Sequence, residues 1–256
     1  MKRARQALPA VLLLAGLIGI WELYVDLHGS TFSLVLPAPH QVAKALYTDR
    51  GLLWSNFLVT AEEVLLGIVV ATVTGFLLAV GIHFSPTLRR AAYPLLVASQ
   101  AVPVVIFAPV LAFWLGFGLL PKLVVIALVS FFSIVVTTTA GLAAVDPDML
   151  KLMRTFDASR LRTFWHVELP AALPGVFTGA KIAVAVSVIG AVFAEWNGSN
   201  SGLGYVILQS LPQLLAARGV AAVVILSLFA IGLFSLLAMA ERLALPWAYR
   251  SGKEPS

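Results

Sequence analysis

DPDMLKLMRTFDASRLRTFWHVELP, residues 146–170, is a charged amphipathic segment between stretches that read as helices buried in lipid. It carries 8 of the chain's 29 formal charges in 25 of its 256 residues. A loop that only joins two helices needs just a few residues. The length and charge of this insert therefore favour a surface for a partner protein, and the alternative is a loop that rests on the bilayer.

The first half of the insert is predicted to be a short helix. Asp146 can cap its N-terminus, and Pro147 suits the first helical position, where the N–H that it lacks would have no partner. Four apolar residues follow at spacings i, i+3, i+4 and i+7, which places them on one face: Met149, Leu152, Met153 and Phe156. Asp157 ends this pattern and tolerates the left-handed conformation of a tight turn.

The second half predicts another short helix, about residues 157–165, which Asp157 or Ser159 can cap. Its apolar side forms a knob between charged residues: Leu161, Phe164 and Trp165. The breaks at 169–170 (LP) and 173–175 (LPG) are expected to separate this helix from the next one. The insert as a whole is therefore predicted to be a helix–turn–helix on one membrane face.

The rest of the chain has the composition of an integral membrane protein. It is 60% hydrophobic and 11% charged, with a mean hydropathy of +0.97, whereas soluble domains carry about a quarter charged residues. A span needs about 20 mostly apolar residues. Six spans are predicted, and the fold class is all-α: Ala7–Trp21, Val64–Ile82, Ala91–Pro121, Leu123–Val145, Ile182–Ala194 and Gly219–Ala240.

The Lys and Arg residues predict the orientation of these spans. With the N-terminus inside, twelve fall on the inner side and four on the outer side: Lys44, Arg50, Lys122 and Arg218. The positive-inside rule then places both termini and the insert in the cytoplasm. The net charge of +5 fits an anionic inner leaflet, and no nucleic-acid partner is needed. A cleaved signal at MKRAR is the less favoured alternative, because no A-x-A site follows.

No catalytic or metal-binding pattern is visible in the sequence. There is no cysteine, which excludes disulfides and thiolate ligands, and the four histidines show no ligand spacing. Glycine groups such as SGLG (201–204) lack the lysine of a phosphate-binding loop. The chain itself is therefore not expected to hydrolyse ATP or to hold a cofactor.

The insert resembles the cytoplasmic motif EAA---G---------I-LP of permeases from binding-protein-dependent ABC importers. The matching positions are Lys151-Leu152-Met153, Asp157, Val167 and Leu169-Pro170. Lys151 reverses the charge of the motif's glutamate, and Asp157 replaces its glycine. Other stretches are similar to the subgroup that imports sulfonates, nitrate and thiamine-precursor pyrimidines: SQAVPVVIFAPVLAFWLGFG, VDPDML, LPGVFTGAKIA, AEWNGSNSGLGY and ERLALPW.

The resemblance covers about residues 55–248 and implies a type I ABC importer permease fold in the bacterial inner membrane. Residues 1–54 would then be an N-terminal helix with a periplasmic segment, and 249–256 a cytoplasmic tail. It further implies a dimer with a second copy or a related permease, two cytoplasmic ATPase subunits that bind ATP, and a periplasmic or lipid-anchored binding protein.

In such importers a coupling helix sits in a groove of the ATPase, and ATP-driven closure turns the permease from inward- to outward-facing. The resemblance assigns this role to about residues 157–165. The residues implied in coupling lie along the insert: Lys151, Arg154, Asp157, Ala158, Ser159, Leu161, Phe164, Trp165, Leu169 and Pro170.

Candidates for a translocation path are polar or helix-breaking residues in or near the spans: Gln100, Pro103, Ser130, Ser133, Glu195, Trp196 and Asn197. Each has a plainer alternative. Gln100 can bond to another helix, the serines can support close helix packing, and Glu195 and Trp196 can lie at the outer membrane surface.

The expected cargo is a thiamine-precursor pyrimidine or a similar small heteroaromatic. The candidate path is mostly neutral, and the one basic residue embedded near a span, Lys181, lies at its cytoplasmic end. The alternatives are a sulfonate such as taurine, or nitrate. An ion-coupled carrier that works alone would be a different class of protein, and it usually has ionisable residues deep in its helices. An intramembrane enzyme is disfavoured because no catalytic set is visible.

Overall fold

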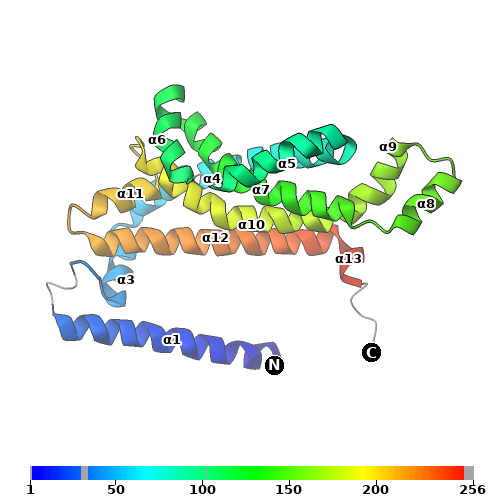
Figure 1. Ribbon diagram of the computed structural model, residues 1–256. Helices are drawn as coiled ribbons and strands as arrows, with labels where there is room; N and C mark the ends of the chain where they lie inside the picture. The colour runs from blue at the N-terminus through cyan, green and yellow to red at the C-terminus, as the bar shows by residue number, and fades with distance from the viewer. Residues whose placement is uncertain (1, 30–33, 102, 251–256) are drawn as a thin grey trace. The chain divides into compact units, whose positions relative to one another are not determined.

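The computed structural model describes residues 2–29, 34–101 and 103–250, and regular structure in this part is entirely helical (Figure 1). The chain divides into two compact units. One consists of Met1–Thr60 with Asn200–Ser227, and the other of Ala61–Ser199 with Leu228–Ser256. The two units are described separately.

Four helical runs are long and apolar enough to cross a membrane: Arg50–Phe84 (α4), Leu119–Ala143 (α7), Arg160–Trp196 and Ala216–Ala244 (α12). A fifth candidate is the pair Pro86–Ala101 (α5) and Ile106–Leu115, within α6 (Val104–Leu115), whose parts meet at 108°. Pro103 is the N-cap of α6, and a proline removes a helical hydrogen bond. The helix is therefore interrupted at Pro103, within the third predicted span.

The first predicted span, Ala7–Trp21, lies within α1 (Lys2–His28). The all-α membrane architecture is thus confirmed. The count of six spans stays a prediction, because four or five candidate spans are found in the described part of the chain.

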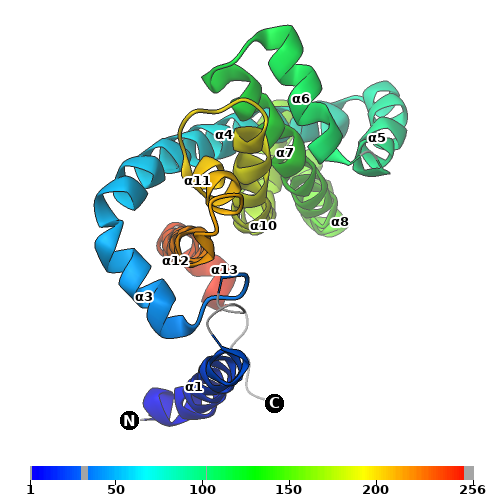
Figure 2. The same cartoon turned by 90° about the vertical axis from the view of Figure 1, so that its left-hand side faces the viewer.

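The larger unit is centred on α7 and α10 (Leu169–Trp196), which lie side by side in Figures 1 and 2. Small residues allow their backbones to approach. A Cβ atom on Gly179 would lie 2.3 Å from Thr137 Oγ1 and 2.8 Å from Ile134 Cα, and one on Gly175 would lie 2.5 Å from the Thr137 carbonyl oxygen. Such small-residue contacts are how membrane helices commonly pack.

The smaller unit contains α1, α3 (Pro39–Thr48), the start of α4, α11 (Leu203–Ser210) and the start of α12. Hydrogen bonds from α4 hold the N-terminus of α11. Asn56 Oδ1 accepts from Gly202 N at 2.7 Å, and Thr60 Oγ1 accepts from Leu203 N at 2.8 Å. Arg218 Nε donates to Asp49 Oδ2 at 2.7 Å, which joins α12 to the residue after α3.

The insert forms α8 (Pro147–Thr155), α9 (Arg160–Thr163) and the π-helix η1 (Phe164–Glu168). Its predicted start and turn are confirmed. Asp146 accepts from the Asp148 N–H at 2.8 Å, Asp157 has a φ of +52°, and Ser159 caps α9 by accepting from the Arg162 N–H.

The predicted breaks before the fifth span are wrong. The helix runs from η1 directly into α10, with Pro170 in its first turn and Pro174 inside it. A π-helix pairs each carbonyl with an N–H five residues later, as in the bond from the Leu169 N–H to the Phe164 carbonyl. Proline is also tolerated in the first turn of a helix. For both reasons α9, η1 and α10 are continuous.

Candidate functional site

The first half of the insert exposes its apolar face. Met149 is 47% exposed, Leu152 48% and Phe156 72%. The side chain of Lys151 pairs with Asp148 at 2.7 Å on the same helix, and both are largely exposed. α8 thus presents an apolar stripe beside fixed charges, a combination typical of a protein-binding surface.

The second half of the insert separates the three residues of the predicted knob. Leu161 is 61% exposed and Trp165 57%, whereas Phe164 is only 4% exposed. Phe164 packs against Leu142 and Ala172, and its ring centroid lies 5.0 Å from that of Phe84. The expectation that Phe164 is part of an exposed knob is therefore wrong, because the C-terminal end of α4 covers it.

That end of α4 holds the second half of the insert through polar contacts as well. Arg160 Nη2 donates to the backbone carbonyls of His83 and Phe84 at 3.5 and 3.3 Å. The guanidinium carbon of Arg160 lies 4.8 Å from the centre of the Phe84 ring. His83 Nε2 and Glu168 Oε2 are 2.9 Å apart. These partners lie 76 to 85 residues apart in the sequence, and no sequence pattern joins them.

A polar cavity of about 430 Å³ lies between α8, α9 and the end of α4. Seven residues line it, two of which, Arg154 and Ala158, were predicted in the coupling set: His83, Leu150, Arg154, Ala158, Arg160, Thr163 and Glu168. Two further residues of the predicted coupling set, Leu169 and Pro170, form the start of α10.

Two of the predicted path residues lie at a contact between helices. The Ser130 side chain is fully buried, and its hydroxyl donates to the Ala183 carbonyl at 3.5 Å. Ser133 Oγ donates to the Ser130 carbonyl at 2.8 Å and lies 3.5 Å from the Gly179 carbonyl. Both serines thus lie at the α7–α10 contact, which is the plainer alternative that the sequence allowed.

Gln100 and Pro103 lie at the bend between α5 and α6. The Gln100 side chain is exposed and approaches Ser99 Oγ at 3.4 Å, and Pro103 starts α6. At the end of α10, Asn197 Nδ2 donates to the Phe193 carbonyl at 2.8 Å. Trp196 is 37% exposed and its ring meets Phe193 edge-on. None of these contacts tests a role on a path.

A buried charged cluster occupies the region where α4, α7 and the end of α10 meet. Glu195 is fully buried, in contrast to the surface position that the sequence also allowed. Lys122 Nζ donates to Glu63 Oε1 at 2.6 Å and to Ser199 Oγ at 2.8 Å. Sequence reasoning missed Glu63 and Lys122, because each begins an apolar run and so resembles an ordinary interfacial residue.

Lys181 is likewise paired. Its Nζ donates to Glu241 Oε2 on α12 at 2.7 Å, and the side chains are 19% and 7% exposed. The basic residue that the sequence analysis placed near the end of a span is therefore paired with a carboxylate.

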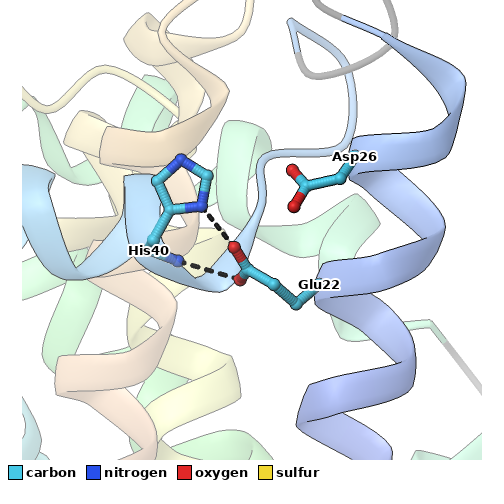
Figure 3. A group of neighbouring side chains, drawn as sticks. All are labelled: Glu22, Asp26 and His40. Carbon is cyan, nitrogen blue, oxygen red and sulfur yellow. Dashed lines mark hydrogen bonds and ion pairs between the residues drawn. The ribbon is translucent and has the colours of Figure 1, made fainter.

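One histidine lies close to two carboxylates despite its sequence spacing (Figure 3). Glu22 on α1 accepts from the His40 N–H at 3.2 Å and also contacts His40 Nδ1. Asp26 is one turn further along α1, and the three ligand-type atoms lie within 4.8 Å of one another. The group is largely open to solvent, and the contacts between Glu22 and His40 join α1 to the N-terminus of α3.

Comparison with known proteins gives a consistent result. Residues 67–244 match the family described as "Binding-protein-dependent transport system inner membrane component". The formylaminopyrimidine transport permease ThiX of Halalkalibacterium halodurans is 34% identical over 96% of this chain and 98% of its own length. The taurine transport permease TauC of Escherichia coli is 28% identical over 95% and 91%, respectively.

A solved structure shares the fold at low sequence identity. An amino acid ABC transporter, crystallised with histidines, superposes with a TM-score of 0.64 at 15% identity, covering 77% of this chain and 96% of that one. Members of the matched family are transport components, and ATP is hydrolysed by a separate subunit of the assembly. The chain belongs to the family of binding-protein-dependent inner-membrane transport components, as a multi-pass permease subunit of an ABC importer.

Proposed function

We propose that residues 146–170 form the surface on which the ATPase subunit docks, and that α9 and η1 pass its movement to the spans. The observation that carries this is an exposed apolar row on an otherwise charged insert: Met149, Leu152, Phe156, Leu161 and Trp165. Apolar side chains at the centre of a charged rim are the usual source of binding energy in small interfaces.

The assembly that fits this role is a dimer, made with a second copy or a related permease. Two cytoplasmic ATPases bind and hydrolyse ATP, this chain holds no cofactor, and a periplasmic or lipid-anchored binding protein delivers the cargo. Co-purification from detergent extracts tests the assembly. We expect an ATPase subunit in equal number to the permease, and a permease that transports without any ATPase would contradict the proposal.

The proposed orientation places the insert and both termini in the cytoplasm. Because the chain has no cysteine, single cysteines can report the side of the membrane. A cysteine replacing Ser159 is expected to react only from the cytoplasmic side, and one replacing Asn200 only from outside. Labelling of both positions from the same side would mean that the orientation or the span count is wrong.

The proposed cargo is a small heteroaromatic of the thiamine-precursor pyrimidine type. The relative named for formylaminopyrimidine transport aligns over nearly the whole chain at 34% identity. The charges also support a neutral cargo, since Lys181 and Lys122 each pair with a glutamate, whereas an anion path is expected to carry unpaired basic residues. The relative named for taurine transport, at 28% identity, makes a sulfonate the main alternative.

Growth of a deletion strain separates these two cargoes. In a thiamine auxotroph, loss of the gene is expected to abolish growth on a limiting formylaminopyrimidine and leave growth on taurine as sole sulfur source unchanged. The plasmid-borne gene should restore growth. Normal use of the pyrimidine together with lost use of taurine would overturn the assignment.

A further inference from the structure

The two halves of the insert differ in how they are attached. Side-chain hydrogen bonds from α8 stay within the helix and its cap, as in the Lys151–Asp148 pair and the Asp146 cap. The second half is instead bonded to α4, through Arg160 and through Glu168. A force applied to the second half therefore acts on α4 as well as on α10.

Arg160 acts as a cap for the cytoplasmic end of α4. The last carbonyls of a helix have no partner within it, and a cation there is also favoured by the helix dipole. Arg160 meets both needs, because it donates to the carbonyls of His83 and Phe84 while its guanidinium stacks on the Phe84 ring.

Beside this cap, the end of α4 also contacts the second half of the insert through apolar packing and through a charged pair. The rings of Phe84 and Phe164 lie 5.0 Å apart in a cluster with Leu142 of α7 and Ala172 of α10. His83 and Glu168, only 21% and 12% exposed, close the contact on its polar side. Partly buried pairs hold their geometry better than solvated ones, because losing one partner leaves the other unsatisfied.

The same helices are also tied together far from the insert. Glu63, twenty residues before His83 on α4, pairs with Lys122 of α7, which also binds Ser199 just after α10. Between these two contacts, glycines allow α4 and α7 to pack closely. A Cβ atom on Gly67 of α4 would lie 2.4 Å from the Ile126 side chain of α7.

We infer that His83, Arg160 and Glu168 are positioning residues for ATP-driven transport, forming a joint that makes the cytoplasmic half of α4 move with α9, η1 and α10. This rests on the proposed role of the insert in coupling. The joint stays closed through the transport cycle, so that one docked ATPase moves two spans together. The family motif lies in the insert alone, and it does not assign the α4 side of this contact.

A crosslink tests whether the joint stays closed. The variant His83→Cys/Glu168→Cys removes the pair from a chain without other cysteines. In reconstituted complexes we expect it to lower ATP-driven uptake about tenfold, the consequence of about 1.4 kcal/mol of lost coupling energy. Bridging the two thiols with a short bis-methanethiosulfonate reagent should restore uptake to within about twofold of the wild type, and a reductant should lower it again.

Two results would overturn the inference. Wild-type uptake by the uncrosslinked variant would show that the joint does not position anything. Loss of the remaining uptake on crosslinking, reversed by reductant, would show that the contact must open during transport. The single variants His83→Cys and Glu168→Cys, treated with the same reagent, control for modification alone.

Recovery of the ATPase with each variant separates this inference from the proposed docking surface. The joint variants are expected to retain the ATPase, because neither side chain belongs to the exposed apolar row. Reduced recovery with these variants would count against a positioning role. Unchanged recovery of the ATPase with variants of the exposed row would instead contradict the docking proposal. The crosslinking result would still decide whether the joint stays closed.

Discussion

The two halves of the insert make a direct comparison, since both are amphipathic and their surroundings differ. The first half leaves Met149, Leu152 and Phe156 exposed, and the side-chain hydrogen bonds of α8 stay within the helix and its cap. α9 and η1 bury Phe164 against three spans, cap α4 and continue into α10. The difference is between an exposed apolar surface and an element that is packed against three spans.

The largest effect is expected from a substitution in the second half of the insert, which is anchored to the spans. Phe164→Ala removes a buried ring from the cluster with Phe84, Leu142 and Ala172, and such a truncation costs about 3–5 kcal/mol. We expect a clear drop in the thermal midpoint of the purified protein in detergent. Phe156→Ala, which truncates an equally large but exposed ring, serves as control and should leave the midpoint unchanged.

A smaller effect is expected where α10 packs on α7 and supports the anchored half. Gly179→Ala places a methyl group against Thr137 and the backbone of Ile134, and overpacking of this kind costs about 1–3 kcal/mol. Gly232→Ala on α12, where nothing lies within 4 Å of the new atom, is the matched control. If both variants melt like the wild type, the close contact between α7 and α10 is wrong.

The smallest effect concerns the turn that joins the two halves. Asp157 has a left-handed backbone, which costs a β-branched residue about 1–2 kcal/mol. Asp157→Val is therefore expected to lower ATPase stimulation modestly by misorienting α8 relative to α9. Asp157→Gly should behave as the wild type, because glycine adopts this conformation readily. Equal loss in both variants would point to a role of the carboxylate instead.

Most of the insert was predictable because its signals are local. Asp146, Pro147, Asp157 and Ser159 act on backbone groups within a few residues, and each is found in its predicted role. Apolar spacing also identified the exposed face of α8. The resemblance to a known motif added the family, which the comparisons confirm.

The residues that sequence reasoning missed depend on distant partners. Phe164 reads as part of an apolar knob until the end of α4, about 80 residues earlier, covers it. Lys122 and Glu63 each resemble a charged residue at the membrane surface. They form a buried pair only because the fold brings together two residues that are 59 positions apart in the sequence. The serines of α7 could face a path or a neighbour, and their contacts with carbonyls of α10 become visible only in the structure. Periodicity within one helix carries no information about these contacts.

The exposed row itself offers the most direct test of the central claim, that the insert docks the ATPase. The double variant Leu161→Ala/Trp165→Ala removes two side chains that are exposed in this chain. Truncating an aromatic side chain that becomes buried in an interface costs about 2 kcal/mol or more of binding free energy. Recovery of the ATPase with the tagged permease is the measurement. We expect it to fall at least tenfold at an unchanged thermal midpoint. Undiminished recovery, with wild-type stimulation of ATP hydrolysis, would contradict the account.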